Sequence, residues 1–87
     1  MYDITDYSYQ QAKKLGVEIK PSTRKGKKID VFKKGNKIAS IGATGYSDFP
    51  HLLQKDKDLA LKRREAYRSR HKNNTGTAGF YATRILW

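Results

Sequence analysis

The side chains best suited to chemistry in this sequence are its cations, which fall into two blocks. Residues 13–37 hold ten lysines and arginines against two acidic residues, a net charge of +8. Residues 55–72 hold eight against three, a net charge of +5. Lysine attracts phosphate as a point charge, and arginine can hold it through two parallel hydrogen bonds. A run of charge is usually only a solvated face, but two blocks in one small chain favour a binding patch.

We expect anion or nucleic-acid binding at twelve residues of these blocks. They are Arg24, Lys25, Lys27, Lys28, Lys33, Lys34, Lys37, Arg63, Arg64, Arg68, Arg70 and Lys72. The lysines of the first block also suit a different role, because charged side chains protect an edge strand against aggregation. Both interpretations of the first block stay open.

The residues that could support catalysis are few. His51 and His71 are the only histidines, and there is no cysteine. Two histidines twenty residues apart form no metal site unless carboxylates join them. A small nuclease that uses His71 with Asp58 and Glu65 stays possible, but this spacing matches no metal-nuclease motif. We therefore expect no enzyme activity, no cofactor and no metal.

The segment Gly42-Ala43-Thr44-Gly45 matches in letters the GxxG loop that clamps a nucleic-acid backbone. That loop joins two helices, whereas this segment follows a predicted strand. A connector that needs positive φ angles is the favoured interpretation.

A short helix and a strand are expected to precede the first basic loop. Residues 8–11 read Ser-Tyr-Gln-Gln, a capping box that predicts a helix start. The helix should end near Leu15, with Gly16 as its C-terminal cap. Residues 17–20 alternate apolar and polar, as in a strand, which Pro21 is expected to stop.

A β-hairpin is predicted in the centre of the chain. The basic segment 22–28 should be a loop. The segments 29–32 and 37–41 should be the paired strands, because Gly and Asn in the intervening 33–36 tolerate the positive φ of a hairpin turn.

Helices are expected in the second half of the chain. Ser47 or Asp48 should cap one, with Pro50 in its first turn, and residues 56–72 should form a longer one. On the longer helix, Leu59 and Ala66 are expected to face the core with Tyr67. One row of basic side chains on it is Arg64, Arg68 and Lys72, and a neighbouring row is Arg63, Tyr67 and Arg70.

Residues 73–79 predict a turn, and residues 80–87 a short helix or extended tail that docks on the core. Phe80, Tyr81, Leu86 and Trp87 are expected to close that core rather than stack on bases. Burial of each such side chain is worth about 1.5–3 kcal/mol.

Composition sets the frame for these elements. The chain has 87 residues and a net charge of +11, enough for one basic domain over 1–87. We expect an α+β fold with a short N-terminal helix, a small antiparallel β-hairpin sheet and C-terminal helices packed on it. An acidic N-terminus and the lack of any long apolar run predict no signal peptide and no membrane span.

Three segments together carry a resemblance. They are the helix Tyr9–Gly16, the hairpin Lys28–Gly42, and an ending that joins Arg63–Lys72 to Gly79-Phe80-Tyr81 and Ile85-Leu86-Trp87. They resemble small basic proteins of unassigned function from large eukaryotic DNA viruses of the giant-virus and Chlorella-virus kind. The resemblance implies a viral source and a place in the particle, and it supplies no catalytic residues.

Charge and resemblance together predict a non-catalytic structural or binding protein. Its partner would be polyanionic: DNA, or acidic capsid-protein surfaces in the virion. The alternative is a sequence-nonspecific nucleic-acid-binding protein acting inside the infected cell, in the nucleus or cytoplasm. Neither interpretation predicts secretion or a small-molecule substrate.

Overall fold

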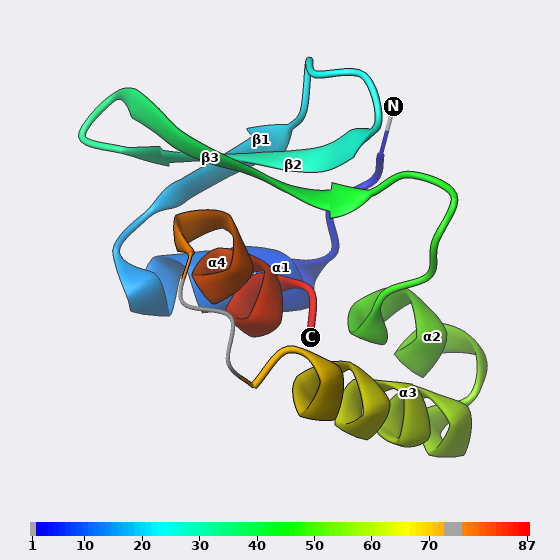
Figure 1. Cartoon of the computed structure of the whole chain (residues 1–87). Coiled ribbons are helices and arrows are strands. Elements are labelled where there is room, and N and C mark those ends of the chain that lie inside the picture. The colour runs from blue at the N-terminus through cyan, green and yellow to red at the C-terminus, as the bar shows by residue number, and fades with distance from the viewer. Residues whose placement is uncertain (1, 73–75) are drawn as a thin grey trace.

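A three-stranded antiparallel sheet forms one layer of the protein, and helices lie beneath it (Figure 1). The computed structural model describes residues 2–72 and 76–87. The strands, in the spatial order β1-β2-β3, are β1 (Glu18–Pro21), β2 (Lys27–Lys33) and β3 (Asn36–Ala43). The helices of the described residues are α1 (Asp6–Leu15), α2 (Phe49–Lys55), α3 (Lys57–Arg70) and α4 (Thr77–Ile85). The predicted α+β fold is confirmed.

The first helix begins earlier than the sequence predicts. Thr5 is its N-cap, and the Thr5 hydroxyl accepts a hydrogen bond from the Ser8 amide at 3.3 Å. Ser8 is fully buried and donates its hydroxyl to the Ile85 carbonyl at 2.9 Å. The predicted capping box at Ser8 is therefore wrong, because a cap lies three residues upstream and the Ser8 side chain serves a long-range contact. The predicted cap at Gly16 is confirmed, with φ at 73°.

The hairpin is confirmed, and its strands are longer than predicted. Lys33 pairs with Asn36 across a turn in which Lys34 and Gly35 have φ angles of 53° and 80°. Two positive φ angles in a two-residue loop fit the turn that matches the twist of a hairpin. Lys27 and Lys28 belong to β2 rather than to the preceding loop. β1 ends at Pro21 as expected, although Pro21 itself is the last residue of the strand, a position that an edge strand tolerates.

The main core lies between the sheet and the helices α1 and α4. Its fully buried side chains include Ile29, Val31, Ile41 and Ile85. Side chains alternate between the two faces of a strand, so Asp30 lies on the opposite face from Ile29 and Val31. This core fixes the ends of β2 and β3 against α4.

Helices α2 and α3 form an arm with a smaller core of its own, built from Phe49, Leu52 and Ala60. The arm begins as predicted: Asp48 caps α2 by accepting a hydrogen bond from the His51 amide at 3.1 Å. The long second helix is also confirmed, with its N-cap at Asp56.

The expected core face of α3 is wrong. Leu59 and Ala66 are exposed, and Ala60 is the α3 side chain that is fully buried among those described. The helix is so polar that its sequence shows no clear apolar stripe, and its inner side is made of Ala60 together with half-buried Arg64 and Tyr67.

The C-terminal segment is helical and docks on the core. Residues 73–75 of the predicted turn lie outside the described residues, and Thr77–Gly79 already belong to α4, so that part of the prediction is wrong. Leu86 is buried, and Tyr81 and Trp87 pack against the core as expected. Phe80 departs from the prediction, since 40% of it is exposed.

The GxxG segment connects the sheet to the arm. Gly42 and Gly45 both have positive φ angles, 77° and 88°, as the connector interpretation expects. A Cβ atom on Gly42 would lie 2.7 Å from Cδ1 of Leu86. Glycine is therefore needed at position 42 for both its backbone angle and its closeness to the Leu86 side chain.

Candidate functional site

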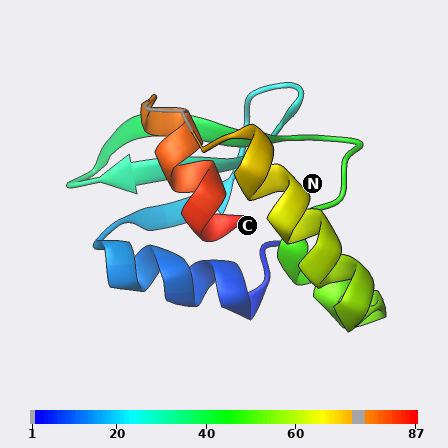
Figure 2. The ribbon, with the colours of Figure 1, turned by 60° about the horizontal axis from the view of Figure 1, so that its bottom comes forward.

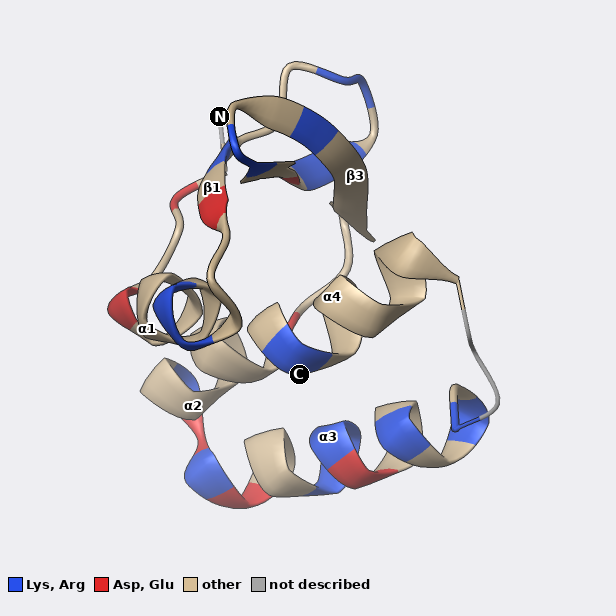
Figure 3. Cartoon of the chain, turned by 90° about the vertical axis from the view of Figure 1, so that its left-hand side faces the viewer, with Lys and Arg blue, Asp and Glu red and all other residues tan. Residues whose placement is uncertain are grey.

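Most of the positive charge of the protein has no internal counter-charge. Within residues 2–72 and 76–87 the ion pairs are Lys28 with Asp48 at 2.9 Å and Lys37 with Asp30 at 3.7 Å. The other described lysines and arginines have no aspartate or glutamate oxygen within 4.0 Å of a side-chain nitrogen. Figure 3 shows lysines and arginines at opposite ends of the molecule, on the loop above the sheet and along α3.

A cleft of about 640 Å³ brings members of the two blocks together. We call it the α3 cleft. Its lining from α3 and the residue that follows it includes Arg63, Ala66, Tyr67, Arg70 and His71. Its lining from the C-terminal segment includes Ala78, Gly79, Ala82, Leu86 and Trp87, and its lining from the sheet includes Lys27, Ser40, Ile41 and Gly42. Figure 2 shows α3 and α4 side by side with the sheet behind them, and both helices contribute lining residues to this cleft.

The electrostatics of the α3 cleft favour an anion. Lys27 from the first block and Arg63 and Arg70 from the second all line it, and none of these three has a carboxylate partner among the described residues. Within the part of the chain that the structure describes, no aspartate or glutamate lines the cleft. The cleft therefore combines an apolar floor with uncompensated positive charge.

A column of three aromatic rings forms part of the cleft wall. The Tyr67 ring stacks on the His71 ring at a centroid distance of 4.2 Å and on the Trp87 ring at 4.6 Å. Burial raises the pKa of Tyr67, while a hydrogen bond with Thr83 and the charge of Arg70 act in the opposite direction. The column joins α3 to the C-terminal segment, so the width of the cleft depends on it.

The predicted row of Arg64, Arg68 and Lys72 is confirmed, but it lies on a different side of α3 from the residues that line the α3 cleft. These side chains line a shallow depression that also contains Glu65. The Arg64 guanidinium lies 4.6 Å from the Phe49 ring centre, and Arg68 donates a hydrogen bond to the main-chain oxygen of Trp87 at 3.2 Å. Both arginines therefore have structural roles, and Glu65 makes this face less suited to an anion than the α3 cleft.

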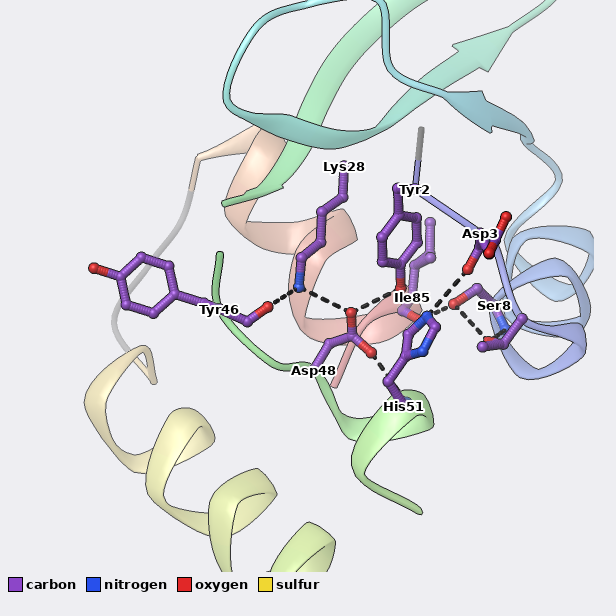
Figure 4. A network of polar contacts seen from close by, with 9 residues as sticks. Tyr2, Asp3, Ser8, Lys28, Tyr46, Asp48, His51 and Ile85 are labelled. Atoms are coloured by element: carbon purple, nitrogen blue, oxygen red, sulfur yellow. Dashed lines mark hydrogen bonds and ion pairs between the residues drawn. The ribbon is translucent and has the colours of Figure 1, made fainter. Parts of the chain in front are cut away.

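Lys28 is not available to an external anion, so its prediction as an anion-binding residue is wrong. It is 95% buried, and its ammonium donates hydrogen bonds to Asp48 Oδ2 and to the Tyr46 carbonyl (Figure 4). The Tyr2 hydroxyl donates to the same Oδ2 atom at 2.7 Å. Burial, the hydrogen bond to Asp48 and the charge of Asp48 all raise the pKa of Tyr2. Nothing in the basic run of the sequence distinguishes Lys28 from its neighbours.

The other cations of the first block lie outside the cleft. Arg24 and Lys25 are exposed on the loop before β2, and Lys33, Lys34 and Lys37 are exposed at or beside the hairpin turn. Of the described cations in that block, Lys27 and Lys28 line the α3 cleft, and Lys28 is paired with Asp48. Lys27 is therefore the one that can offer its charge to a ligand there.

Asp30 holds the basic loop in place. It accepts hydrogen bonds from the hydroxyls of Ser22 at 2.6 Å and Ser40 at 2.7 Å, and from the Thr23 amide at 3.3 Å. Burial alone raises the pKa of Asp30, but these hydrogen bonds and the charge of Lys37 outweigh it and leave the pKa below its ordinary value. The loop that carries Arg24 and Lys25 is thus anchored by a charged carboxylate.

The residues weighed for a nuclease do not converge. His71 lies in the aromatic column, and neither Asp58 nor Glu65 lines the cleft with it. His51 makes a hydrogen bond through Nε2 with the Asp3 carbonyl at 3.0 Å. No group of three or more His, Asp or Glu side chains placed to hold a metal ion occurs in the described part of the chain. Across the same ranges, no helix is both long and apolar enough to traverse a bilayer.

Comparisons with curated proteins and with solved structures give no match. A family match runs from the residue before β1 to the end of the α3 region. It therefore includes Lys27, Arg63 and Arg70, whereas the α4 side of the cleft lies beyond it. This match, over residues 17–71, shows that the chain belongs to the family of unknown function DUF5754.

Proposed function

We propose that this protein is a non-catalytic nucleic-acid-binding protein and that the α3 cleft is the centre of its binding surface. One observation carries the proposal: Lys27, Arg63 and Arg70 all line a cleft that has no aspartate or glutamate among its described lining residues. A net charge of +11 repels itself within so small a chain, and phosphates relieve that repulsion. Nucleic acid supplies phosphates at the required density.

The biological setting of the proposal comes from the sequence resemblance. Small basic proteins of large DNA viruses provide the comparison, and it favours a component of the particle that contacts packaged DNA. Action on nucleic acid inside the infected cell is the alternative setting. The presence or absence of the chain in purified virions separates the two.

An acidic protein surface, such as that of a capsid protein, is a second candidate partner. The arm carries three leucines, Leu53, Leu59 and Leu61, that are each at least 38% exposed. Apolar side chains between cations are typical of a protein interface and are of no use to a phosphate backbone.

Fluorescence anisotropy with labelled duplex DNA at two salt concentrations tests the proposal. Affinity should fall steeply with salt, with a logarithmic slope of about 0.9 per phosphate contact. Substitution of both Arg63 and Arg70 by glutamine should weaken binding and lower the slope by about two contacts.

The matched control replaces Lys13 and Lys14 by glutamine. These residues lie in the last turn of α1, outside the α3 cleft, so the variant loses the same charge at another place. Equal weakening by both double substitutions would show that net charge matters and the cleft does not. No binding at low salt would reject nucleic acid as the partner.

A further inference from the structure

We infer that the α3 cleft accepts one unpaired nucleotide, with its base between α3 and α4 and its phosphate on the cationic rim. The protein should then prefer single-stranded nucleic acid to duplex. This inference rests on the proposed function and assigns a substrate class to its site.

The interior of the cleft has no use in duplex binding. Ile41, Ala82 and Leu86 give it an apolar floor, and its volume of about 640 Å³ lies in the usual range for small-molecule sites. A duplex presents phosphates and sugars outward and keeps its bases stacked, so it covers the rim without filling the floor. An unpaired base is planar and largely apolar on its faces, and it fills such a space.

The cations stand where the attached phosphates would lie. Arg63 and Arg70 are seven residues apart on α3, so about 10 Å separates them along the helix axis. Both are exposed, and the half-buried Lys27 lies on the sheet side of the same cleft. A base in the cleft thus has positive charge on two sides of its entrance.

Polar groups are available to the edges of the base. Ser47 and His71 line the cleft among its apolar side chains, whereas the hydroxyl of Ser40, which also lines it, is already donated to Asp30. A purely aliphatic ligand would cover the Ser47 hydroxyl and the His71 imidazole without offering them hydrogen bonds, which costs free energy. An anionic ligand with a polar-edged ring fits the lining better than a fatty chain.

The protein contains a built-in probe of this site. Trp87 is its only tryptophan and lines the cleft. Titration with a nucleoside monophosphate should quench or shift its fluorescence. Inorganic phosphate and ribose 5-phosphate, which lack the base, should produce a much smaller change at the same ionic strength.

A substitution that fills the cleft tests the inference without a change of charge. Ala66 is exposed and lines the cleft, so Ala66→Leu places bulk inside it while keeping a good helix former. Ser69→Leu is the matched control, because Ser69 is exposed on α3 and lines the shallow depression instead. Circular dichroism melts should show that both variants fold.

The expected result is selective. Ala66→Leu should weaken binding of short oligo(dT) and oligo(U) by about tenfold, the loss that accompanies a lost base contact, and leave duplex binding unchanged. Ser69→Leu should leave both unchanged. The oligo(dT) and oligo(U) arms separate DNA from RNA as the source of the nucleotide.

Other results would overturn the inference. Equal affinity for single strand and duplex, with no effect of Ala66→Leu, would reject the nucleotide site while the proposed function stands. No binding of either form would reject both. A polyglutamate peptide that binds as tightly as the oligonucleotides, and loses affinity in Ala66→Leu, would assign the cleft to an acidic protein.

Discussion

Replacement of Asp48 by alanine removes several interactions at one buried point. The carboxylate caps α2, pairs with the ammonium of Lys28 and accepts the hydroxyl of Tyr2. The side chains of Lys28 and Asp48 are only 6% and 2% exposed. Without Asp48 the Lys28 charge stays in the interior, where its remaining partners, the Tyr46 carbonyl and the Tyr2 ring at 5.4 Å, carry no negative charge.

The expected cost follows from these contacts. Loss of a cap costs about 1 kcal/mol, and removal of one member of a buried ion pair costs about 3–5 kcal/mol. The sum of about 4–6 kcal/mol is a large part of the 5–15 kcal/mol that stabilises an ordinary domain. Asp48→Ala should therefore unfold at a much lower urea concentration and temperature than the parent.

Two variants isolate the buried charge. Asp56→Ala removes the N-cap of α3, which is exposed and has no ion pair, so it should cost only about 1 kcal/mol. Addition of Lys28→Met to Asp48→Ala removes the stranded ammonium and should restore much of the lost stability. Urea melts followed by circular dichroism measure all of them.

A loss of stability in Asp48→Ala no larger than that in Asp56→Ala would refute the stranded charge as the cause. A double variant as unstable as Asp48→Ala alone would refute it as well. Either result would mean that the Lys28 ammonium finds water or another partner when Asp48 is lost.

Three further predictions concern the fold. The pKa of Asp30 is lowered in the folded state. The contribution of Asp30 to stability is therefore present above the ordinary pKa of a carboxyl group and is lost as the pH falls through the pKa of the folded state. Asp30→Asn should accordingly flatten the acid side of a plot of melting temperature against pH. Gly42→Ala should lower the free energy of unfolding by about 2–5 kcal/mol, through backbone strain and overpacking against Leu86. Gly45 has open space around it, so Gly45→Ala should cost only the backbone strain of about 1–2 kcal/mol. Thermal melts compare the two variants, and equal losses of stability would refute the contribution of the Leu86 contact. Removal of residues 80–87 should unfold the protein because Ile85 and Leu86 are in the core. The control Phe80→Ser changes an exposed position and should leave the melting temperature nearly unchanged. A truncated chain with the melting temperature of the full chain would contradict the core role of this segment.

Local signals account for the features that the sequence predicts well. The turn at Lys34-Gly35, the αL cap at Gly16 and the Asp48 cap before Pro50 each depend on neighbours a few residues away. The three together place the first helix, the hairpin and the arm. The α+β class follows from them.

Long-range contacts explain the failures. Ser8 has the right pattern for a cap, but its hydroxyl is taken by Ile85 at the other end of the fold. Lys28 looks like any lysine of its run, and only the fold brings Asp48 to it. In α3, charged side chains surround a single buried alanine, so periodicity does not identify the inner face.

The candidate site shows the same division. Composition predicts the two cationic blocks, and helical spacing predicts the row Arg64, Arg68 and Lys72. The meeting of Lys27 with Arg63 and Arg70 depends on how the arm is placed against the sheet. No pattern of sequence spacing encodes that placement.

The closure of the core by the C-terminal segment has a kinetic consequence. The Ser8–Ile85 hydrogen bond joins residues 77 positions apart, and the Tyr2–Asp48 hydrogen bond joins residues 46 positions apart. Contacts so distant in the chain slow folding, because loop entropy is lost before the contacts form. During synthesis, Ile29, Val31 and Ile41 must wait for Ile85 and Leu86 to leave the ribosome before they are covered. A nascent chain of this protein therefore exposes apolar strands next to a dense positive charge until the C-terminal segment can cover them.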